Sequence, residues 1–281
     1  PNNYIFRSSN KDGRRSSFFV GRIIIMNPDT ASVLKEFAVQ YNRPDLFEQD
    51  PIRFQKHFAV LMEEGKASLQ DVEVAAVIAA HLAWGRRDMI VRDCTRAFDE
   101  MDWQPHNYVM EARYRSDDRS RHRTIKWSDF AAICSRLKRY YSENLSLETA
   151  SVEDIRCEIY GQKPDRNAAN KKINMMRRWM VRRDGIVDLG LWRNTDPASL
   201  VIPLDVQVHR VALEMGLTSR RSADARTATE ITAALKEVFP DDPCLGDFAL
   251  FAYGVSRKNN GSSELSTNLG LSPIAFFLIL M

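Results

Sequence analysis

The stretch that decides the fold runs from Ala169 to Met215, reading ANKKINMMRRWM at 169–180 and VIPLDVQVHRVALEM at 201–215. In both segments apolar residues recur at helical spacing, so each segment predicts an amphipathic helix. Two adjacent lysines open the first helix and a lone aspartate opens the second. No alternation of apolar and polar residues is long enough to demand a sheet, so we expect an all-α fold.

The same helical spacing continues on both sides of this stretch. We expect helices over residues 30–42, 48–64, 69–84, 89–101, 127–143, 151–160, 170–183, 206–216, 223–239 and 246–255. The segment 69–84 is rich in alanine and valine, which allow close packing, so we expect its helix at the centre. The segment 114–123 is dense in arginine and aspartate and predicts an exposed loop.

The chain is long enough to bury a core, and 44% of its 281 residues are hydrophobic. We expect one domain over 26–255, preceded by a disordered or foreign leader at 1–25 and followed by an irregular tail at 256–281. The net charge of +3 reflects an excess of cations in the leader, so it does not indicate a nucleic-acid partner. The local density does, because eight lysines and arginines lie between Lys163 and Arg183 against Asp165 alone.

The four cysteines are far apart in sequence and form no C-x-x-C pair, so we expect no metal site and no cofactor. No apolar run is long enough for a signal peptide or a membrane span. These features are typical of a soluble, cytoplasmic protein without membrane contact.

The lysine pair could supply a nucleophilic amine. An ordinary lysine has a pKa of about 10.4, and neighbouring cations or burial lower it and increase the neutral fraction. On a helical wheel Lys171 lies with Arg178 and Arg182 on a basic edge, whereas Lys172 projects from the apolar face. Most lysine pairs at a helix start are simply solvated, so the pair alone does not indicate chemistry.

Asp205 follows Pro203 and Leu204 and stands where an N-cap carboxylate is expected. An ionised carboxylate in a cleft can also take a proton from an amine or stabilise positive charge on a sugar ring. Capping alone is the commoner role, and the sequence leaves both open.

Taken together, K-x-I-x-M-M and, after a connection, I-P-L-D-V-x-V-x-R-V-A resemble the core of the helix-hairpin-helix DNA glycosylase superfamily. The segments YNRPDLFEQDP, VAAVIAAHLAWGRR, KKINMMRRWMVRRDGIVDLGLW, IPLDVQVHRVA and DPCLGDFALFAYGV are similar to a bacterial family of glycosylase relatives. This resemblance spans about Tyr41 to Val255. It implies a two-lobed helical fold with a central cleft and a role in DNA repair by base excision.

In the superfamily a lysine attacks C1′ of a flipped, damaged nucleotide and can go on to cleave the strand as a lyase. The resemblance implies that Asp205 assists the lysine. Superfamily spacing places apolar residues two and five positions after the lysine, which favours Lys171, with Ile173 and Met176, as the nucleophile. Lys172 remains the alternative and, in that case, Lys171 would be a neighbour of the site.

Other residues complete the expected site. Phosphate contacts are predicted for Lys172, Arg177, Arg178, Arg182, Arg183, Arg86 and Arg87. Trp192, Trp84 and Trp179 are candidates to stack on an extruded base, although core packing is the simpler role for the last two.

The expected partner is duplex DNA with its damaged base flipped out, bound by a monomer located at the nucleoid; RNA in place of DNA stays open. The superfamily hairpin carries Gly-x-Gly where this chain has Asn167 to Asn170. That difference favours a second hypothesis, a non-catalytic nucleic-acid-binding module on the same scaffold. A third is a protein-interaction scaffold whose basic stripe binds an acidic partner.

Overall fold

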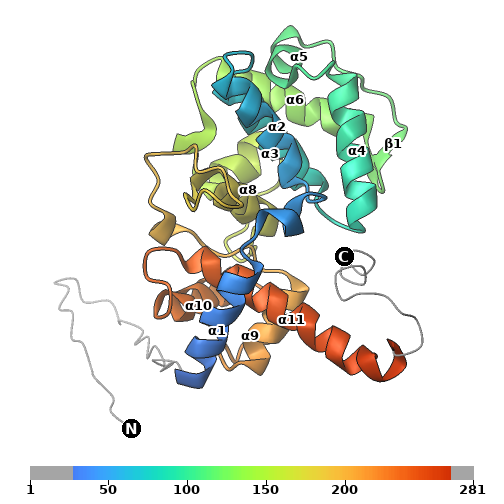
Figure 1. The fold of residues 1–281 in the computed structure, drawn as a ribbon. Coiled ribbons are helices and arrows are strands. Elements are labelled where there is room, and N and C mark those ends of the chain that lie inside the picture. Colours follow the sequence, from blue (N-terminus) through green and yellow to red (C-terminus); the bar gives the residue numbers. More distant parts are fainter. Residues whose placement is uncertain (1–27, 267–281) are drawn as a thin grey trace, which may run out of the picture.

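The computed structural model describes residues 28–266, which form two groups of helices (Figure 1). The helices are α1 Pro28–Tyr41, α2 Ile52–Glu63, α3 Leu69–Leu82, α4 Arg87–Glu100, α5 Pro105–Glu111, α6 Trp127–Tyr141, α7 Val152–Asp154, α8 Lys171–Val181, α9 Val206–Glu214, α10 Ala225–Lys236 and α11 Pro243–Ser266. Short 3₁₀ turns lie at Pro44–Phe47, Leu147–Thr149 and Pro197–Ser199, and a π-helical turn lies at Ile155–Ile159. The prediction of an all-α fold is confirmed.

The two lobes are built from different parts of the chain. One lobe contains α2 to α8, and the other contains α1 with α9, α10 and α11 (Figure 1). Helix α1 packs along α11, and α11 also packs against α9 and α10. The chain therefore crosses from the second lobe to the first after α1, and returns through the long connection between α8 and α9.

Helix α3 is the centre of the first lobe, as its composition predicts. It packs against α2, α4, α5 and α8, and its residues 72–80 are all buried. A helix that is apolar on every side is stable only when other helices surround it. Ser68 caps its start, with a hydroxyl that accepts from the amide of Asp71, whose carboxylate accepts in return.

Glu73 is the polar exception inside α3 and is fully buried. Its carboxylate accepts from the indole Nε1 of Trp192 at 2.7 Å, the hydroxyl of Tyr141 at 2.9 Å and the amide of Leu147 at 3.1 Å. Burial raises the pKa of Glu73, and these donors act against that rise. One side chain thus ties α6 and two connecting segments to the central helix.

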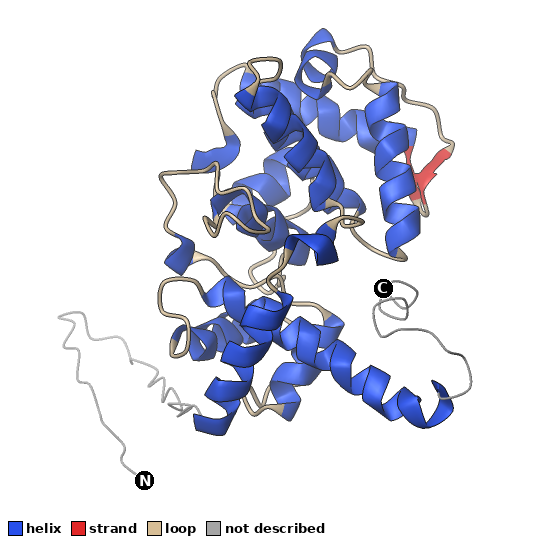
Figure 2. Cartoon of the chain, in the orientation of Figure 1, coloured by secondary structure: helices blue, strands red, loops and turns tan. Residues whose placement is uncertain are grey.

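Two expectations about irregular segments are wrong. Residues 114–123 are not wholly exposed, because β1 Ser120–His122 pairs with β2 Ile125–Lys126 in a small hairpin, red in Figure 2. Arg121 and His122 are buried there, and His122 Nδ1 lies 2.8 Å from Asp93 Oδ2. The expected tail also begins too early, since α11 continues to Ser266. The leader at 1–25 and the end of the tail lie outside the described residues.

We expect Trp192→Phe to lower the free energy of unfolding by about 2–3 kcal/mol, because it removes a donor from a buried carboxylate. Trp103→Phe is the matched control, since its Nε1 donates to Asp99 in an exposed bond of 3.0 Å. That change should cost clearly less. Denaturant unfolding of both variants measures the difference, and equal losses would contradict the role given to Glu73.

Candidate functional site

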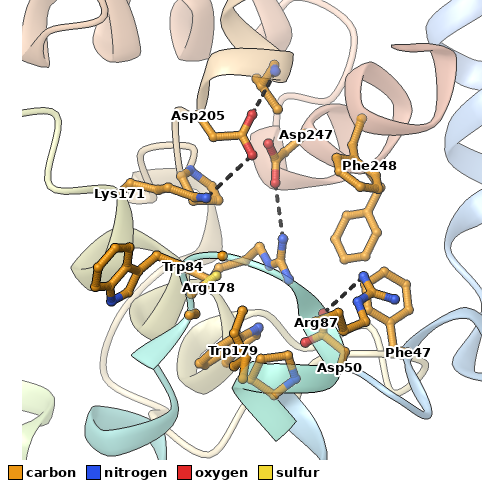
Figure 3. A pocket seen from close by; sticks show the side chains of 18 residues that line it. Phe47, Asp50, Trp84, Arg87, Lys171, Arg178, Trp179, Asp205, Asp247 and Phe248 are labelled. Carbon is orange, nitrogen blue, oxygen red and sulfur yellow. Dashed lines mark hydrogen bonds and ion pairs between the residues drawn. The ribbon is translucent and has the colours of Figure 1, made fainter. Parts of the chain in front are cut away.

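A pocket of about 230 Å³ lies between the two lobes (Figure 3). The turn before α2 contributes Phe47 and Asp50, and the segment after α3 contributes Trp84 and Gly85. The remaining walls come from the start of α4, from α8, from the start of α9 and from α11. The residues that these four elements contribute include Arg87, Lys171, Met175, Arg178, Trp179, Asp205, Asp247, Phe248 and Phe251.

Lys171 is the first residue of α8, and its side chain reaches the pocket. Its Nζ lies 3.5 Å from Asp205 Oδ2, and 39% of the side chain is exposed. The residue before it, Asn170, has a left-handed backbone with φ of 49°. Asparagine is one of the few residues other than glycine that adopts this conformation readily, so Asn170 supports a turn that glycine would otherwise form.

Asp205 serves two partners with two different oxygens. Oδ1 accepts from the amide of Val208 at 2.8 Å, which confirms the predicted N-cap of α9. Oδ2 faces Lys171 (Figure 3). Capping and contact with the lysine are therefore compatible, and a catalytic role of Asp205 beside its capping role stays a prediction.

Lys172 points elsewhere. Its Nζ donates to the backbone carbonyl of His81 at 2.7 Å and lies 5.8 Å from the centre of the Trp84 ring. Burial, and then the charge of Lys171, lower the pKa of Lys172 to about 8. It is thus the more desolvated amine, as the helical wheel indicates, but it lines a neighbouring pocket of about 250 Å³ with His81 and Tyr160 rather than the pocket of Asp205.

Asp247, on α11, is a second carboxylate in the pocket that the sequence did not single out. Its Oδ2 accepts from Arg178 Nη1 at 3.1 Å, and its side chain is 7% exposed. Burial raises the pKa of Asp247 to about 7; Arg178 opposes the rise, Asp205 adds to it and Lys171 opposes it. The signal available in the sequence was an aspartate between Gly246 and Phe248 in the otherwise largely apolar segment 244–255.

For two of the arginines, the prediction of a phosphate contact is wrong. Arg178 is 8% exposed and Arg182 is 1% exposed, and both are held inside the protein by carboxylates. Arg182 pairs with Asp242 at 2.7 Å and Asp184 at 2.6 Å, and Asp188 lies within 3.5 Å of both guanidinium groups. Buried cations need such partners, and these are therefore structural ion pairs rather than a basic surface.

The other predicted cations have partners within the protein but keep some exposure. Arg177 is half-buried and donates to the carbonyl of Ala150, and Arg183 is exposed and donates to carbonyls in the segment 192–195. Arg86 is exposed and pairs with Asp88. Arg87 lines the pocket and lies 3.4 Å from Asp50. For these four, as for Lys172, phosphate contact stays a prediction.

The three tryptophans have different positions. Trp192 is completely buried against Glu73, so its proposed stacking on a base is wrong. Trp84 is partly exposed and lines both pockets, with the guanidinium of Arg123 4.4 Å from its ring centre. Trp179 is 1% exposed but forms part of the pocket wall. Stacking by Trp84 or Trp179 stays a prediction.

Within residues 28–266, no group of three or more His, Cys, Asp or Glu side chains could hold a metal ion. None of the described helices combines the length and the apolar character needed to span a bilayer.

The fold and the pocket define a two-lobed helical protein in which Lys171 and three carboxylates, Asp50, Asp205 and Asp247, line a partly aromatic cavity. The sequence profile of one family matches residues 50–163 and 153–256, and the chain belongs to that family, DUF2400, described as proteins of unknown function. No curated protein and no solved structure gave a significant match.

The position of Asp247 predicts an effect of pH on stability. It is faced by Arg178 and Lys171 of α8 and by Asp205, and its folded pKa of about 7 lies above its ordinary value of 3.8. Between these values the folded state binds more protons, so its stability falls as pH rises. We expect wild-type protein to lose about 1 kcal/mol per pH unit relative to Asp247→Asn between pH 4 and pH 7.

Denaturant unfolding at each pH measures this loss. Asp224→Asn is the control, because the amide of Thr227, with Arg220, lowers the pKa of this partly exposed carboxylate. The free energy of unfolding of wild type relative to Asp224→Asn should not fall as pH rises from 4 to 7. If the free energy of unfolding changed with pH in the same way for wild type and Asp247→Asn, the raised pKa given to Asp247 in the folded state would be contradicted.

Proposed function

We propose that the protein is a DNA base-excision glycosylase with lyase activity, in which Lys171 is the nucleophile and Asp205 assists it. The observation that carries the proposal is the approach of Lys171 Nζ to Asp205 Oδ2, 3.5 Å, at the edge of an aromatic pocket. The resemblance to the helix-hairpin-helix glycosylases supports the same two residues independently, through their spacing in the sequence.

The pocket offers what a flipped nucleotide needs. Phe47, Phe248 and Phe251 supply apolar ring surface on which a base can pack, and Lys171 stands at the wall where the sugar would follow. Enzymes that act on a base extrude it from the stack, because the reacting atom is inaccessible in a duplex. The pocket has a volume of about 230 Å³, which leaves room for a ligand the size of one base.

The reaction follows from these positions. Asp205 accepts a proton from the Lys171 ammonium, and the neutral amine attacks C1′. The glycosidic bond breaks, and its electron pair leaves with the base, which takes up a proton. The lysine nitrogen then loses a proton, O4′ takes one up as the C1′–O4′ bond breaks, and the open sugar is held as an iminium between Lys171 and C1′. Loss of a proton from C2′ and departure of the 3′-phosphate can then cleave the strand.

Geometry favours Lys171 over Lys172 as the nucleophile, although burial lowers the pKa of Lys172. With a pKa of about 8, about a tenth of Lys172 is neutral at pH 7. Its amine is nevertheless bound to the carbonyl of His81 and lines the neighbouring pocket. Attack needs a reacting atom at about 3–3.5 Å in the correct direction, and only Lys171 shares a pocket with Asp205.

The first test uses a duplex with a single abasic site, which offers an aldehyde at C1′ and requires no recognition of a base. Borohydride should trap a covalent adduct with wild type, and Lys171→Gln should abolish it. Lys172→Gln should retain most of it, because its amine faces away from Asp205. Denaturing gels measure the adduct, and melting curves verify that both variants are folded.

If wild type forms no adduct but binds the duplex, the family member is a non-catalytic nucleic-acid-binding module. An adduct that depends on Lys172 instead would reverse the assignment of the two lysines.

The second test separates catalysis by Asp205 from capping. Asparagine caps helices about as well as aspartate, so Asp205→Asn should change stability by less than about 1 kcal/mol. It should slow adduct formation by about 100-fold or more, because the proton acceptor is lost. Single-turnover kinetics with the abasic duplex measures the rate.

Asp224→Asn is a closely matched control. Asp224 caps α10 through the amide of Thr227 at 2.9 Å and pairs with Arg220, and its side chain is 28% exposed against 26% for Asp205. It lies outside the pocket lining. Equal rates for the two variants would show that Asp205 acts only as a cap.

A further inference from the structure

The pocket contains an acceptor that the proposed chemistry does not use. Oδ1 of Asp247 is buried and has no hydrogen-bond partner among the described residues, although Oδ2 is bound by Arg178. Asp247 lines the pocket, and Figure 3 shows its carboxyl beside that of Asp205. The two carboxylates come from different helices, and only Asp205 faces Lys171.

An unpaired carboxylate oxygen is a costly feature. Buried polar groups are almost always hydrogen-bonded, and a carboxylate can accept at both oxygens. No donor of the described residues forms a hydrogen bond with Oδ1; Phe248 and Phe251 follow Asp247 on the same helix, and the ring of Phe47 packs against that of Phe248. A ligand that enters the pocket with an N–H group would satisfy this oxygen.

We propose, building on the proposed function, that Asp247 selects bases with a lactam edge, in which a ring N–H stands beside a carbonyl. The N–H donates to Asp247 Oδ1, and the carbonyl oxygen is favoured by the positive charge of Arg178, which binds the other oxygen of the same carboxylate. The aromatic wall packs on the ring. The N–H of the base thus lies against Asp247 Oδ1, and its carbonyl oxygen lies on the side of Arg178.

This edge distinguishes deaminated bases from their parents. Cytosine and adenine present a ring nitrogen lone pair at that position, which a carboxylate repels. Hydrolytic deamination converts the ring nitrogen into an N–H and the adjacent amine into a carbonyl, as in uracil and hypoxanthine. The class that Asp247 selects is therefore bases with a lactam edge, which include the deamination products uracil and hypoxanthine as well as thymine and guanine, and exclude cytosine and adenine.

The selectivity can be tested with free methylated bases and the full chain, by NMR titration at pH 8, where Asp247 is mainly ionised. The N1-methyl group of 1-methyluracil stands in for the sugar and leaves the ring N–H at position 3. We expect 1-methyluracil to bind wild type about tenfold to 100-fold more tightly than 1-methylcytosine or 1,3-dimethyluracil, both of which lack that N–H. The same preference is expected for 9-methylhypoxanthine over 9-methyladenine.

Asp247→Asn should remove most of this preference. Asp188→Asn is the matched control, because Asp188 also faces the guanidinium of Arg178, at 3.5 Å, but does not line the pocket. It should keep the preference. If either variant fails to fold, the comparison of 1-methyluracil with 1,3-dimethyluracil on wild type still decides, since equal affinities would overturn the proposal.

The outcome is separable from that of the proposed function, because trapping at an abasic site involves no base. An adduct through Lys171 without any preference among bases would overturn the role of Asp247 and leave the glycosylase chemistry standing. A preference that depends on Asp247 without an adduct would overturn the chemistry and leave a pocket that selects lactam rings.

Discussion

The ion pairs between α8 and the segment that starts α11 hold the two lobes together across the pocket. Arg178 reaches Asp247 in α11, and Arg182, one turn further along α8, reaches Asp242 just before α11. Both guanidinium groups lie over the ring of Phe248, at 4.5 and 4.8 Å from its centre. Such buried pairs add little net stability, but removing one partner leaves an uncompensated charge. They therefore fix the position of one lobe relative to the other.

The geometry of the candidate site depends on this constraint. Lys171 and Arg178 are seven residues apart, two helical turns, so they project from the same face of α8 toward the second lobe. Anchoring Arg178 to Asp247 therefore also sets the distance between Lys171 and Asp205. Lys172 is rotated by about 100° on the helix and turns into the first lobe instead. One helix thus carries the anchor and the amine, and its rotation decides which lysine reaches the pocket.

Much of this could be predicted from the sequence, because the relevant signals are local. Helical spacing gave the helices, and Asp205 before an apolar repeat gave the cap. The arginines were misjudged because a count of charges says nothing about partners such as Asp242 and Asp247, which lie about 60 to 70 residues away. Trp192 was misjudged for the same reason, since Trp192 lies in a connecting segment and its partner Glu73 lies 119 residues away in α3. Burial of a charge depends on long-range contacts, and these are absent from a periodic pattern.

Asp205 and Asp247, two of the three carboxylates that line the pocket, show how the surroundings distinguish chemically identical groups. Asp205 is partly exposed and has a partner for each oxygen, the Val208 amide and Lys171. Asp247 is buried with one oxygen paired, and burial raises its pKa to about 7, with Asp205 adding to the rise. Carboxylates placed in different surroundings can hold different protonation states at the same pH. Asp247 is needed as the partner of Arg178, but its second, unpaired oxygen still costs free energy, because a buried carboxylate oxygen loses its hydration without gaining a hydrogen bond. This unpaired oxygen lies in the pocket that Arg178 and Lys171 also line, so a bound ligand with an N–H group would offset its cost in free energy.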